Sequence, residues 1–143
     1  MNYILDTNVI SELVSPEPSP GVVAWVDSID PGSIFLSVIT IGELQKGIEK
    51  LVKSKQKDKL TAWLQEDLLV RFQDRILILD TAVLLRWGAL VTSLERMGEP
   101  LPAIDSLLAA TAAETGFTLA TRNIAHFGSA GISVINPWIA EPE

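Results

Sequence analysis

The sequence predicts an α/β fold in which a mostly parallel β-sheet is covered by helices on both faces. Short apolar segments alternate along the chain with longer segments of helical periodicity, and this alternation is typical of parallel strands joined by crossover helices. The chain has 143 residues, of which 48% are hydrophobic, so it is large enough to bury a substantial core. We therefore expect one domain that spans residues 1–143.

Five apolar segments are predicted to be strands because they are short, rich in β-formers and bounded by turn residues. They are residues 3–5, 34–37, 76–79, 117–121 and 132–135. Asp6 follows the first of them directly, and Asp80 follows the third. Asp80 is predicted to cap the helix that begins near Thr81. Residues 122–129 are predicted to be the turn between the last two strands.

Four segments have the apolar spacing of helices. They are residues 41–52, 60–68, 82–97 and a segment that runs from near Ala103 to Gly116. Gly98 and Gly116 are predicted to end the third and fourth helices, because glycine readily takes the left-handed conformation that follows a helix. Only the Pro-rich residues 15–20 and the tail 141–143 are expected to be loops.

Composition excludes several kinds of chemistry. The chain has no cysteine, which rules out disulfides, thiol catalysis and cysteine-ligated metals. It lacks a basic leader and any apolar stretch of membrane-spanning length, so we expect a cytoplasmic protein without a membrane anchor. The four tryptophans are expected to build the core or an interface rather than to stack on bases.

The net charge of -7 argues against an extended phosphate-binding surface. Six of the eleven basic residues nevertheless fall in one short segment, and they are Lys46, Lys50, Lys53, Lys55, Lys57 and Lys59. This run is predicted to be mainly a solvated helix face, with RNA contact as a second interpretation. A basic edge can therefore coexist with an acidic cleft.

Three acidic residues lie where strands and helices of the predicted sheet meet. Asp6 ends the first strand, Glu43 lies near the start of the helix after the second strand, and Asp105 lies near the start of the helix before the fourth. These junctions share one edge of a parallel sheet. Three carboxylates there would repel one another unless a divalent cation bound them, and oxygen ligands favour Mg²⁺ or Mn²⁺. Taken singly, each acid could instead be a cap or an ordinary first-turn residue.

Four segments of the chain resemble motifs of a known family. They are residues 5–13 (LDTNVISEL), 37–44 (SVITIGEL), 102–105 (PAID) and 120–127 (ATRNIAHF). In this order they resemble PIN-domain ribonuclease toxins of VapC type, in the FitB-like branch, from bacterial type II toxin–antitoxin pairs. The resemblance implies a PIN-like three-layer α/β/α fold with a five-stranded parallel sheet. It also implies Mg²⁺-dependent endoribonuclease activity with Mn²⁺ as a possible substitute, a VapB-like antitoxin partner, and a homodimer or larger homo-oligomer.

The resemblance assigns roles to the residues of the predicted site. Asp6, Glu43 and Asp105 match the acidic metal-binding and catalytic positions of the family, and Thr7 and Asn8 match the polar residues that support the first Asp. Bound metal ions at such a site activate water and stabilise charge on phosphate oxygens during RNA hydrolysis.

The fourth motif departs from the family pattern, because His126 stands where family members commonly have Asp. Imidazole could bind a metal, yet it favours softer metals than Mg²⁺ and loses this ability when protonated. A structural role for His126 is the more common alternative. If the residue at this position acts mainly through water, Thr121 and Asn123 would hold the solvent shell in its place. Arg122 is expected either to contact an RNA phosphate or to pair with a nearby carboxylate.

Two other functions remain open from the residues alone. The first is a non-catalytic PIN-like module that uses its acidic cleft to bind a basic segment of a partner, and the change at His126 motivates it. The second is a phosphatase or phosphotransferase with Asp6 as nucleophile. That chemistry typically needs a second Asp shortly after the first, and position 8 is Asn.

Overall fold

The sheet of the computed structural model, which describes all 143 residues, has five parallel strands. They are β1 (Tyr3–Leu5), β2 (Ile34–Ser37), β3 (Ile76–Leu77), β4 (Thr118–Ala120) and β5 (Val134–Ile135). Their order is β3-β2-β1-β4-β5, and all four pairings are parallel. Strand β1 lies at the centre, with Tyr3 opposite both Ile34 and Thr118. The five predicted strands are thus confirmed.

Strand β3 is shorter than the prediction of residues 76–79. Its register places Leu77 opposite Ser37, the last residue of β2, so Ile78 and Leu79 have no strand beside them. Ile78 is accordingly exposed to solvent. How far an edge strand extends depends on the length of the strand beside it. The apolar sequence of β3 does not show that length.

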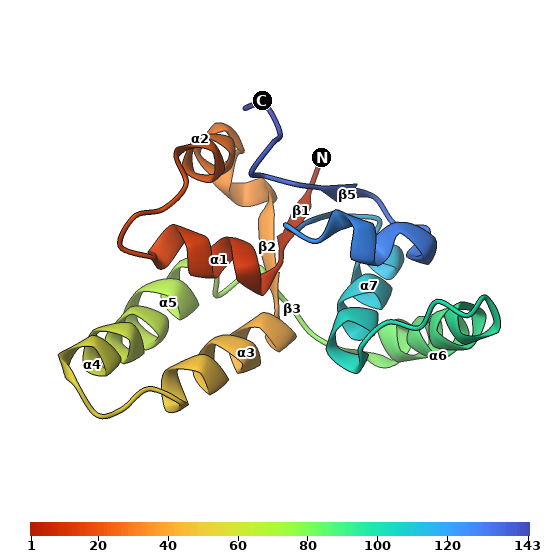
Figure 1. Cartoon of the computed structure of the whole chain (residues 1–143), viewed down its shortest axis with the longest axis horizontal. Helices are drawn as coiled ribbons and strands as arrows, with labels where there is room; N and C mark the ends of the chain where they lie inside the picture. The colour runs from red at the N-terminus through yellow and green to blue at the C-terminus, as the bar shows by residue number, and fades with distance from the viewer.

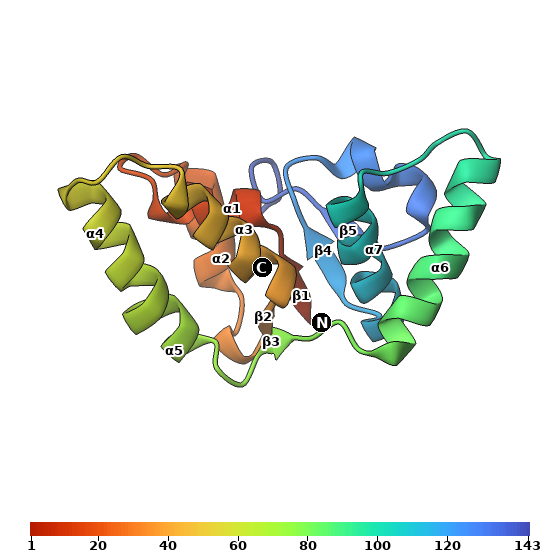
Figure 2. The same cartoon turned by 90° about the horizontal axis from the view of Figure 1, so that it is seen from below.

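The helices form two groups, one on each face of the sheet. Their bounds are α1 (Thr7–Val14), α2 (Pro20–Ser28), α3 (Val38–Glu49), α4 (Lys55–Ala62), α5 (Leu69–Arg71), α6 (Thr81–Arg96) and α7 (Ala103–Thr115). The turn η2 (Trp63–Leu68) is a π-helix that joins α4 to α5, and η1 (Pro31–Ser33) and η3 (Ile124–Ala130) are 3₁₀-helices. Helices α1 to α5 lie on one side of the sheet, and α6 and α7 lie on the other (Figure 2).

Helices α1 and α2 were not among the predicted helices. Helix α1 starts immediately after β1, where the Asp6 side chain accepts a hydrogen bond from the Thr7 amide. Helix α2 starts at Pro20, whose fixed φ suits the first position of a helix, and Ser19 caps it. The predicted loop of residues 15–20 therefore ends one residue early, and a helix follows it.

Two further predictions need correction. Helix α3 begins at Val38 because the Ser37 hydroxyl caps it, accepting from the Ile39 amide at 3.1 Å. Glu43 consequently lies in the second turn, where the positive end of the helix acts on it more weakly than in the first.

Most of the segment predicted as a turn at 122–129 is the 3₁₀-helix η3.

The predicted start of α6 and the predicted ends of α6 and α7 are confirmed. The Asp80 carboxylate caps α6 by accepting from the Val83 amide at 3.0 Å. Gly98 and Gly116 follow α6 and α7 with φ angles of 70° and 74°, in the left-handed region that favours glycine.

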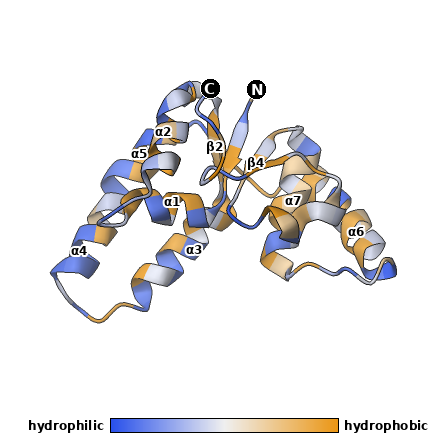
Figure 3. Ribbon diagram, turned by 45° about the horizontal axis from the view of Figure 1, so that its top comes forward, coloured by the Kyte–Doolittle hydropathy of each residue, from blue (hydrophilic) through white to orange (hydrophobic).

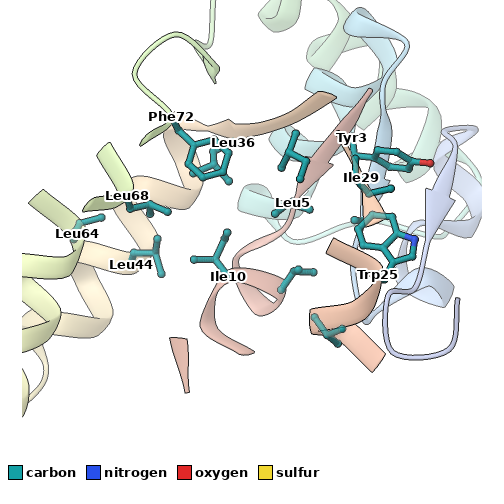
Figure 4. Packing of buried hydrophobic residues seen from close by; sticks show 14 of the residues in the cluster. Tyr3, Leu5, Ile10, Trp25, Ile29, Leu36, Leu44, Leu64, Leu68 and Phe72 are labelled. Atoms are coloured by element: carbon teal, nitrogen blue, oxygen red, sulfur yellow. The ribbon is translucent and has the colours of Figure 1, made fainter. Parts of the chain in front are cut away.

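A large apolar cluster fills the space between the sheet and helices α1, α2 and α3. Trp25 of α2 is fully buried there, and its ring meets that of Tyr3 edge-on with centroids 5.0 Å apart. Figure 4 shows Trp25 and Tyr3 on one side of Leu5, with Ile10 and Phe72 on the other side of the cluster. A smaller cluster on the opposite face includes Phe127 and residues of α7.

The helices differ in polarity according to how deeply they lie. Helix α4 is mostly hydrophilic and buries no residue, whereas α7 is largely apolar and buries six (Figure 3). None of the helices has both the length and the apolar character that crossing a bilayer requires. The two chain ends lie near each other in Figure 1, and the Tyr3 hydroxyl donates to Glu143 Oε2 at 2.7 Å.

Candidate active site

The centre of the candidate site is Asp6, at the carboxyl end of the middle strand. Strands β1 and β4 are neighbours in the sheet. From β1 the chain continues to β2 on one side, and from β4 it continues to β5 on the other side. Open α/β sheets typically bind ligands at such a reversal, in a crevice outside the carboxyl ends of the two strands. Asp6 follows β1 and Thr121 follows β4, so both border this crevice.

Asp6 is held by three donors although only 7% of its surface is exposed. Its Oδ1 accepts from the Thr7 amide at 2.7 Å. Its Oδ2 accepts from the Thr121 hydroxyl at 2.8 Å and, less tightly, from Asn8 Nδ2 at 3.4 Å. These contacts compensate part of the cost of burying the carboxylate.

Thr121 supports Asp6 through a hydroxyl whose hydrogen-bonding capacity is fully used. It donates to Asp6 and accepts from Asn8 Nδ2 at 3.3 Å and from the Asn123 amide at 3.1 Å. A hydroxyl has one proton and two lone pairs, so all three are engaged. The contact of Thr121 is therefore with Asp6 itself, whereas the sequence had suggested that it holds solvent.

Asn8 joins the two loops that border the crevice. Its amide group reaches Asp6 and Thr121, and its Oδ1 accepts from the Arg122 amide at 3.2 Å. The segment after β1 is thereby tied to the segment after β4. Such support keeps the orientation of Asp6 independent of loop motion.

Glu43 reaches the site from the second turn of α3. The Thr7 hydroxyl donates to Glu43 Oε1 at 2.6 Å. Thr7 thus contacts Asp6 through its amide and Glu43 through its hydroxyl. One residue therefore sets the relative position of two of the three predicted carboxylates.

Asp105 lies in the first turn of α7, and the side chain of His126 lies against it. The distance from His126 Nδ1 to Asp105 Oδ2 is 3.2 Å, and the two side chains are 47% and 27% exposed. Phe127, the next residue, is buried and anchors η3 beside α7. His126 therefore lies next to a predicted metal ligand, at the place where the fourth motif was expected to contribute.

The negative charges of the three carboxylates act on one another. Burial raises the pKa of the Asp6 carboxyl; hydrogen bonds from Thr121 and Thr7 oppose this rise, and the negative charges of Asp105 and Glu43 add to it. Burial also raises the pKa of Asp105, while His126 lowers it and Glu43 raises it. Acidic groups whose pKa values are raised by burial and by neighbouring negative charges are often found at functional sites.

The donor set suits a hard divalent cation. The three carboxylates provide only oxygen atoms, which Mg²⁺ and Mn²⁺ prefer. In this arrangement no three acidic or histidine side chains are gathered tightly enough to surround one ion by themselves. Mg²⁺ usually keeps several of its waters and binds directly to only one or two carboxylates, so a looser set of acids is compatible with it.

Arg122 is placed at the exposed rim of the site. Its guanidinium lies over the ring of Trp138 at 5.0 Å, and it forms no ion pair with a carboxylate. The sequence predicts Trp138 only as a core or interface residue. Asn123, also predicted as a supporting residue, is exposed and contributes its backbone amide to Thr121.

Replacing Thr121 by Val tests the support that it gives to Asp6. Val has the same shape but removes the hydroxyl, which leaves Asp6 Oδ2, Asn8 Nδ2 and the Asn123 amide without this partner. We expect Thr121→Val to lower the free energy of unfolding by about 1–3 kcal/mol in urea titrations.

Thr111→Val is the matched control. Thr111 is as deeply buried as Thr121, yet its hydroxyl bonds only to the Leu107 carbonyl of its own helix. This carbonyl keeps its helical partner in the variant, so we expect a smaller loss. Equal losses in the two variants would contradict a special role for Thr121.

Comparisons with known proteins agree with this geometry. The sequence profile of the PIN domain matches residues 3–128. Toxin FitB from Neisseria gonorrhoeae is 38% identical over 135 residues, which cover 94% of this chain and 97% of that protein. VapC ribonuclease Y4jK from Sinorhizobium fredii is 35% identical over 135 residues, which cover 94% of this chain and 96% of that protein.

A solved structure is similar over almost the whole length. The crystal structure of FitAcB from Neisseria gonorrhoeae contains a chain that superposes with a TM-score of 0.92 at 38% sequence identity. The match covers 96% of this chain and 99% of that one. The five-stranded parallel sheet and its flanking helices are thus shared with that chain.

Proposed function

The chain belongs to the PIN-domain family, and from this we propose that it is a Mg²⁺-dependent endoribonuclease that acts as the toxin of a type II toxin–antitoxin pair. The observation that carries the proposal is that Thr7 contacts both Asp6 and Glu43, with Asp105 close enough to raise the pKa of Asp6. Two relatives support it, since one is named a toxin and the other a ribonuclease.

Asp6, Glu43 and Asp105 are the residues that would hold the cation. Mg²⁺, or Mn²⁺ in its place, would supply activation of water and stabilisation of charge on the phosphate oxygens. The carboxylates themselves fix where the cation can bind. While no cation is bound, their negative charge would repel the phosphates of RNA. RNA and cation are therefore expected to bind interdependently.

The supporting residues keep the carboxylates oriented before substrate arrives. Thr7 links Asp6 to Glu43, and Thr121 and Asn8 hold the second oxygen of Asp6. Groups already aligned in this way need no reorganisation during the reaction, which is a main source of electrostatic catalysis. The chain has no cysteine and one histidine, so its composition gives little support to covalent or paired-histidine catalysis.

The proposed antitoxin is a VapB-like protein that inhibits by entering the acidic crevice. A basic side chain, especially an arginine, can bind two carboxylate oxygens at once and would compete with the cation for Asp6 and Asp105. We expect the purified antitoxin to prevent RNA cleavage in proportion to its concentration. Self-association of the chain, as a homodimer or larger, is part of the same proposal.

One observation favours a second candidate, a binding module with weak or no catalysis. His126 lies against Asp105 and occupies the neighbourhood of its Oδ2. If His126 still contacts Asp105 when the cation is added, fewer carboxylate oxygens would be free to bind the cation. A basic segment of a partner could then be the main ligand of the crevice.

Glu43→Gln separates the two candidates. Gln keeps the size of the side chain and can still accept from the Thr7 hydroxyl, but it removes one negative charge. We expect cleavage of a panel of structured and unstructured RNAs, assayed with Mg²⁺ or Mn²⁺, to fall about hundred-fold or more. Circular dichroism should show an unchanged fold.

Glu49→Gln provides a control on the same helix, because Glu49 is exposed and bonds only to Gln45 and, through its carbonyl, to Lys57. Its cleavage rate should equal that of the wild type. Failure of the wild type to cleave any RNA in the panel would favour the binding module.

A further inference from the structure

A groove extends from Glu43 along the exposed face of α3. It has a volume of about 480 Å³ and lies between α3 and the first turns of α7, with Leu79 closing one side. Glu43, Lys46 and Lys50 line its α3 wall, and Ile104 and Leu107 line its α7 wall. One end of the groove therefore opens at the candidate active site, which Glu43 and the neighbouring Asp105 border.

The two lysines of this groove are free to bind a ligand. Lys46 and Lys50 follow Glu43 by one and two helical turns on the same face, roughly 5 and 10 Å along the axis. Both are exposed, and neither takes part in an ion pair or a side-chain hydrogen bond. By contrast, Arg71 and Arg86 are paired with carboxylates.

The α3 wall also carries two glycines that the fold does not require. Gly42 and Gly47 both line the groove, although glycine is among the poorest helix formers. A Cβ atom added at either position would meet no atom within 4 Å outside the neighbouring backbone of its own helix, and neither glycine has a positive φ. No contact inside the chain explains them. Their effect is to leave the helix backbone bare on the side that faces the groove.

The opposite wall is apolar. Ile104 is 43% exposed, an unusual position for a large aliphatic side chain, and Leu107 and Leu79 lie beside it. The groove thus has positive charges on its α3 wall and apolar side chains on its α7 wall, and part of the α3 backbone between them is not covered by side chains. A single-stranded nucleic acid has the complementary chemistry, since its phosphates are anionic and its bases and riboses have apolar faces.

We propose that this groove holds the RNA strand on one side of the scissile phosphate, with Lys46 and Lys50 contacting the adjacent phosphates. Ile104 and Leu107 then contact the riboses or bases, and Gly42 and Gly47 allow the strand to approach the helix. The inference rests on the proposed ribonuclease function and deepens it by placing the substrate. It also explains how an acidic chain can recruit a polyanion, because the positive charge is local to the groove.

The first experiment replaces both lysines by glutamine. The affinity of Asp6→Asn forms for a labelled single-stranded oligoribonucleotide is measured by fluorescence anisotropy, and KM and kcat are measured for the forms with intact Asp6. We expect each lysine to contribute roughly two- to five-fold in affinity. For the double variant Lys46→Gln/Lys50→Gln, the slope of log affinity against log salt should flatten by about 1.4. KM should rise more than kcat falls.

Lys59→Gln is the matched control, because Lys59 is also exposed but lies on α4, outside the groove. The same charge change there should leave affinity and salt slope unaltered. Light scattering on every variant reports the oligomeric state. If the groove variants dissociate an oligomer while RNA affinity stays unchanged, the groove is an interface between copies and the proposal is wrong.

A second experiment fills the groove without changing its charge. Gly47→Gln places a long side chain in the groove and replaces a poor helix former, so we expect Tm to rise by about 2–4 °C while RNA affinity falls. Gly88→Gln on α6 is the control, since a Cβ there also meets nothing within 4 Å outside its own helix backbone and Gly88 does not line the groove. It should raise Tm and leave RNA affinity unchanged.

The outcomes separate this inference from the function on which it rests. If the wild type neither binds nor cleaves RNA, the proposed function itself fails. If the wild type cleaves RNA and the Lys46, Lys50 and Gly47 variants bind and cleave it equally well, only the placement of the strand fails.

Discussion

Asp6→Asn is expected to lower RNA cleavage by about hundred-fold or more, an effect comparable to removing one principal electrostatic contact at a transition state. Asn keeps the size and shape of the side chain and one acceptor oxygen, which can still accept from the Thr7 amide, so the fold should persist. What it lacks is the negative charge that would bind the cation. Cleavage is measured as the initial rate on a labelled RNA in Mg²⁺.

The same substitution is expected to change how the stability of the fold depends on pH, and to favour the variant more as pH rises. Burial raises the pKa of Asp6, and the charges of Asp105 and Glu43 raise it further. The folded chain therefore holds the Asp6 proton more tightly than the unfolded chain does. The stability that comes from this proton is present below the usual carboxyl pKa and is lost as pH rises through the raised pKa of the folded state. Asn never ionises, so it does not lose this stability.

Urea unfolding at pH 4 and pH 7 checks this prediction. The advantage of Asp6→Asn over the wild type should be larger at pH 7 than at pH 4. Asp74→Asn is a suitable control, because Asp74 is exposed and its side chain forms no hydrogen bond. A difference in stability between Asp6→Asn and the wild type that is the same at pH 4 and pH 7 would contradict a raised pKa for Asp6.

The largest effect on stability is expected for Trp25→Ala. Trp25 is fully buried in the cluster between the sheet and α2, where its ring packs edge-on against Tyr3. Truncation to Ala removes most of the side chain and leaves a cavity, which should cost about 3–5 kcal/mol. That is a large fraction of the total stability of a typical domain. Urea denaturation followed by circular dichroism measures the loss.

Trp25→Phe is the informative comparison. The indole Nε1 of Trp25 is buried without a hydrogen-bond partner, so its removal relieves an unfavourable burial while most of the ring volume remains. We expect a much smaller loss than for Ala. If Phe and Ala destabilise the chain equally, the stabilisation by Trp25 does not come from filling this space.

Much of the fold could be predicted because its signals are local. An apolar run that ends at Asp6 or Ser37 marks both a strand and its carboxyl end, and the parallel arrangement then brings those ends to one edge. Helices α1 and α2 escaped prediction for an equally local reason. They are short, and the Pro-rich segment between them masks their periodicity even though Ser19 and Pro20 form a good helix start.

The parts of the site that could not be predicted depend on contacts between distant segments. Thr121 is a common residue at the end of a strand, and only the β1–β4 pairing shows that its hydroxyl meets Asp6. The contact of His126 with Asp105 likewise depends on how η3 packs against α7. Lys46 was predicted mainly as a solvated residue, because nothing in the local sequence shows that α7 lies opposite it.

Whether RNA cleavage requires the cation decides between an enzyme and a binding module. The purified chain is incubated with a labelled single-stranded RNA across a series of Mg²⁺ concentrations, then with EDTA, and then with Mg²⁺ restored in excess. We predict cleavage that rises with Mg²⁺, stops in EDTA and returns when Mg²⁺ is restored. Undiminished cleavage in EDTA, or no cleavage at saturating Mg²⁺, would contradict a metal-dependent ribonuclease built on Asp6, Glu43 and Asp105.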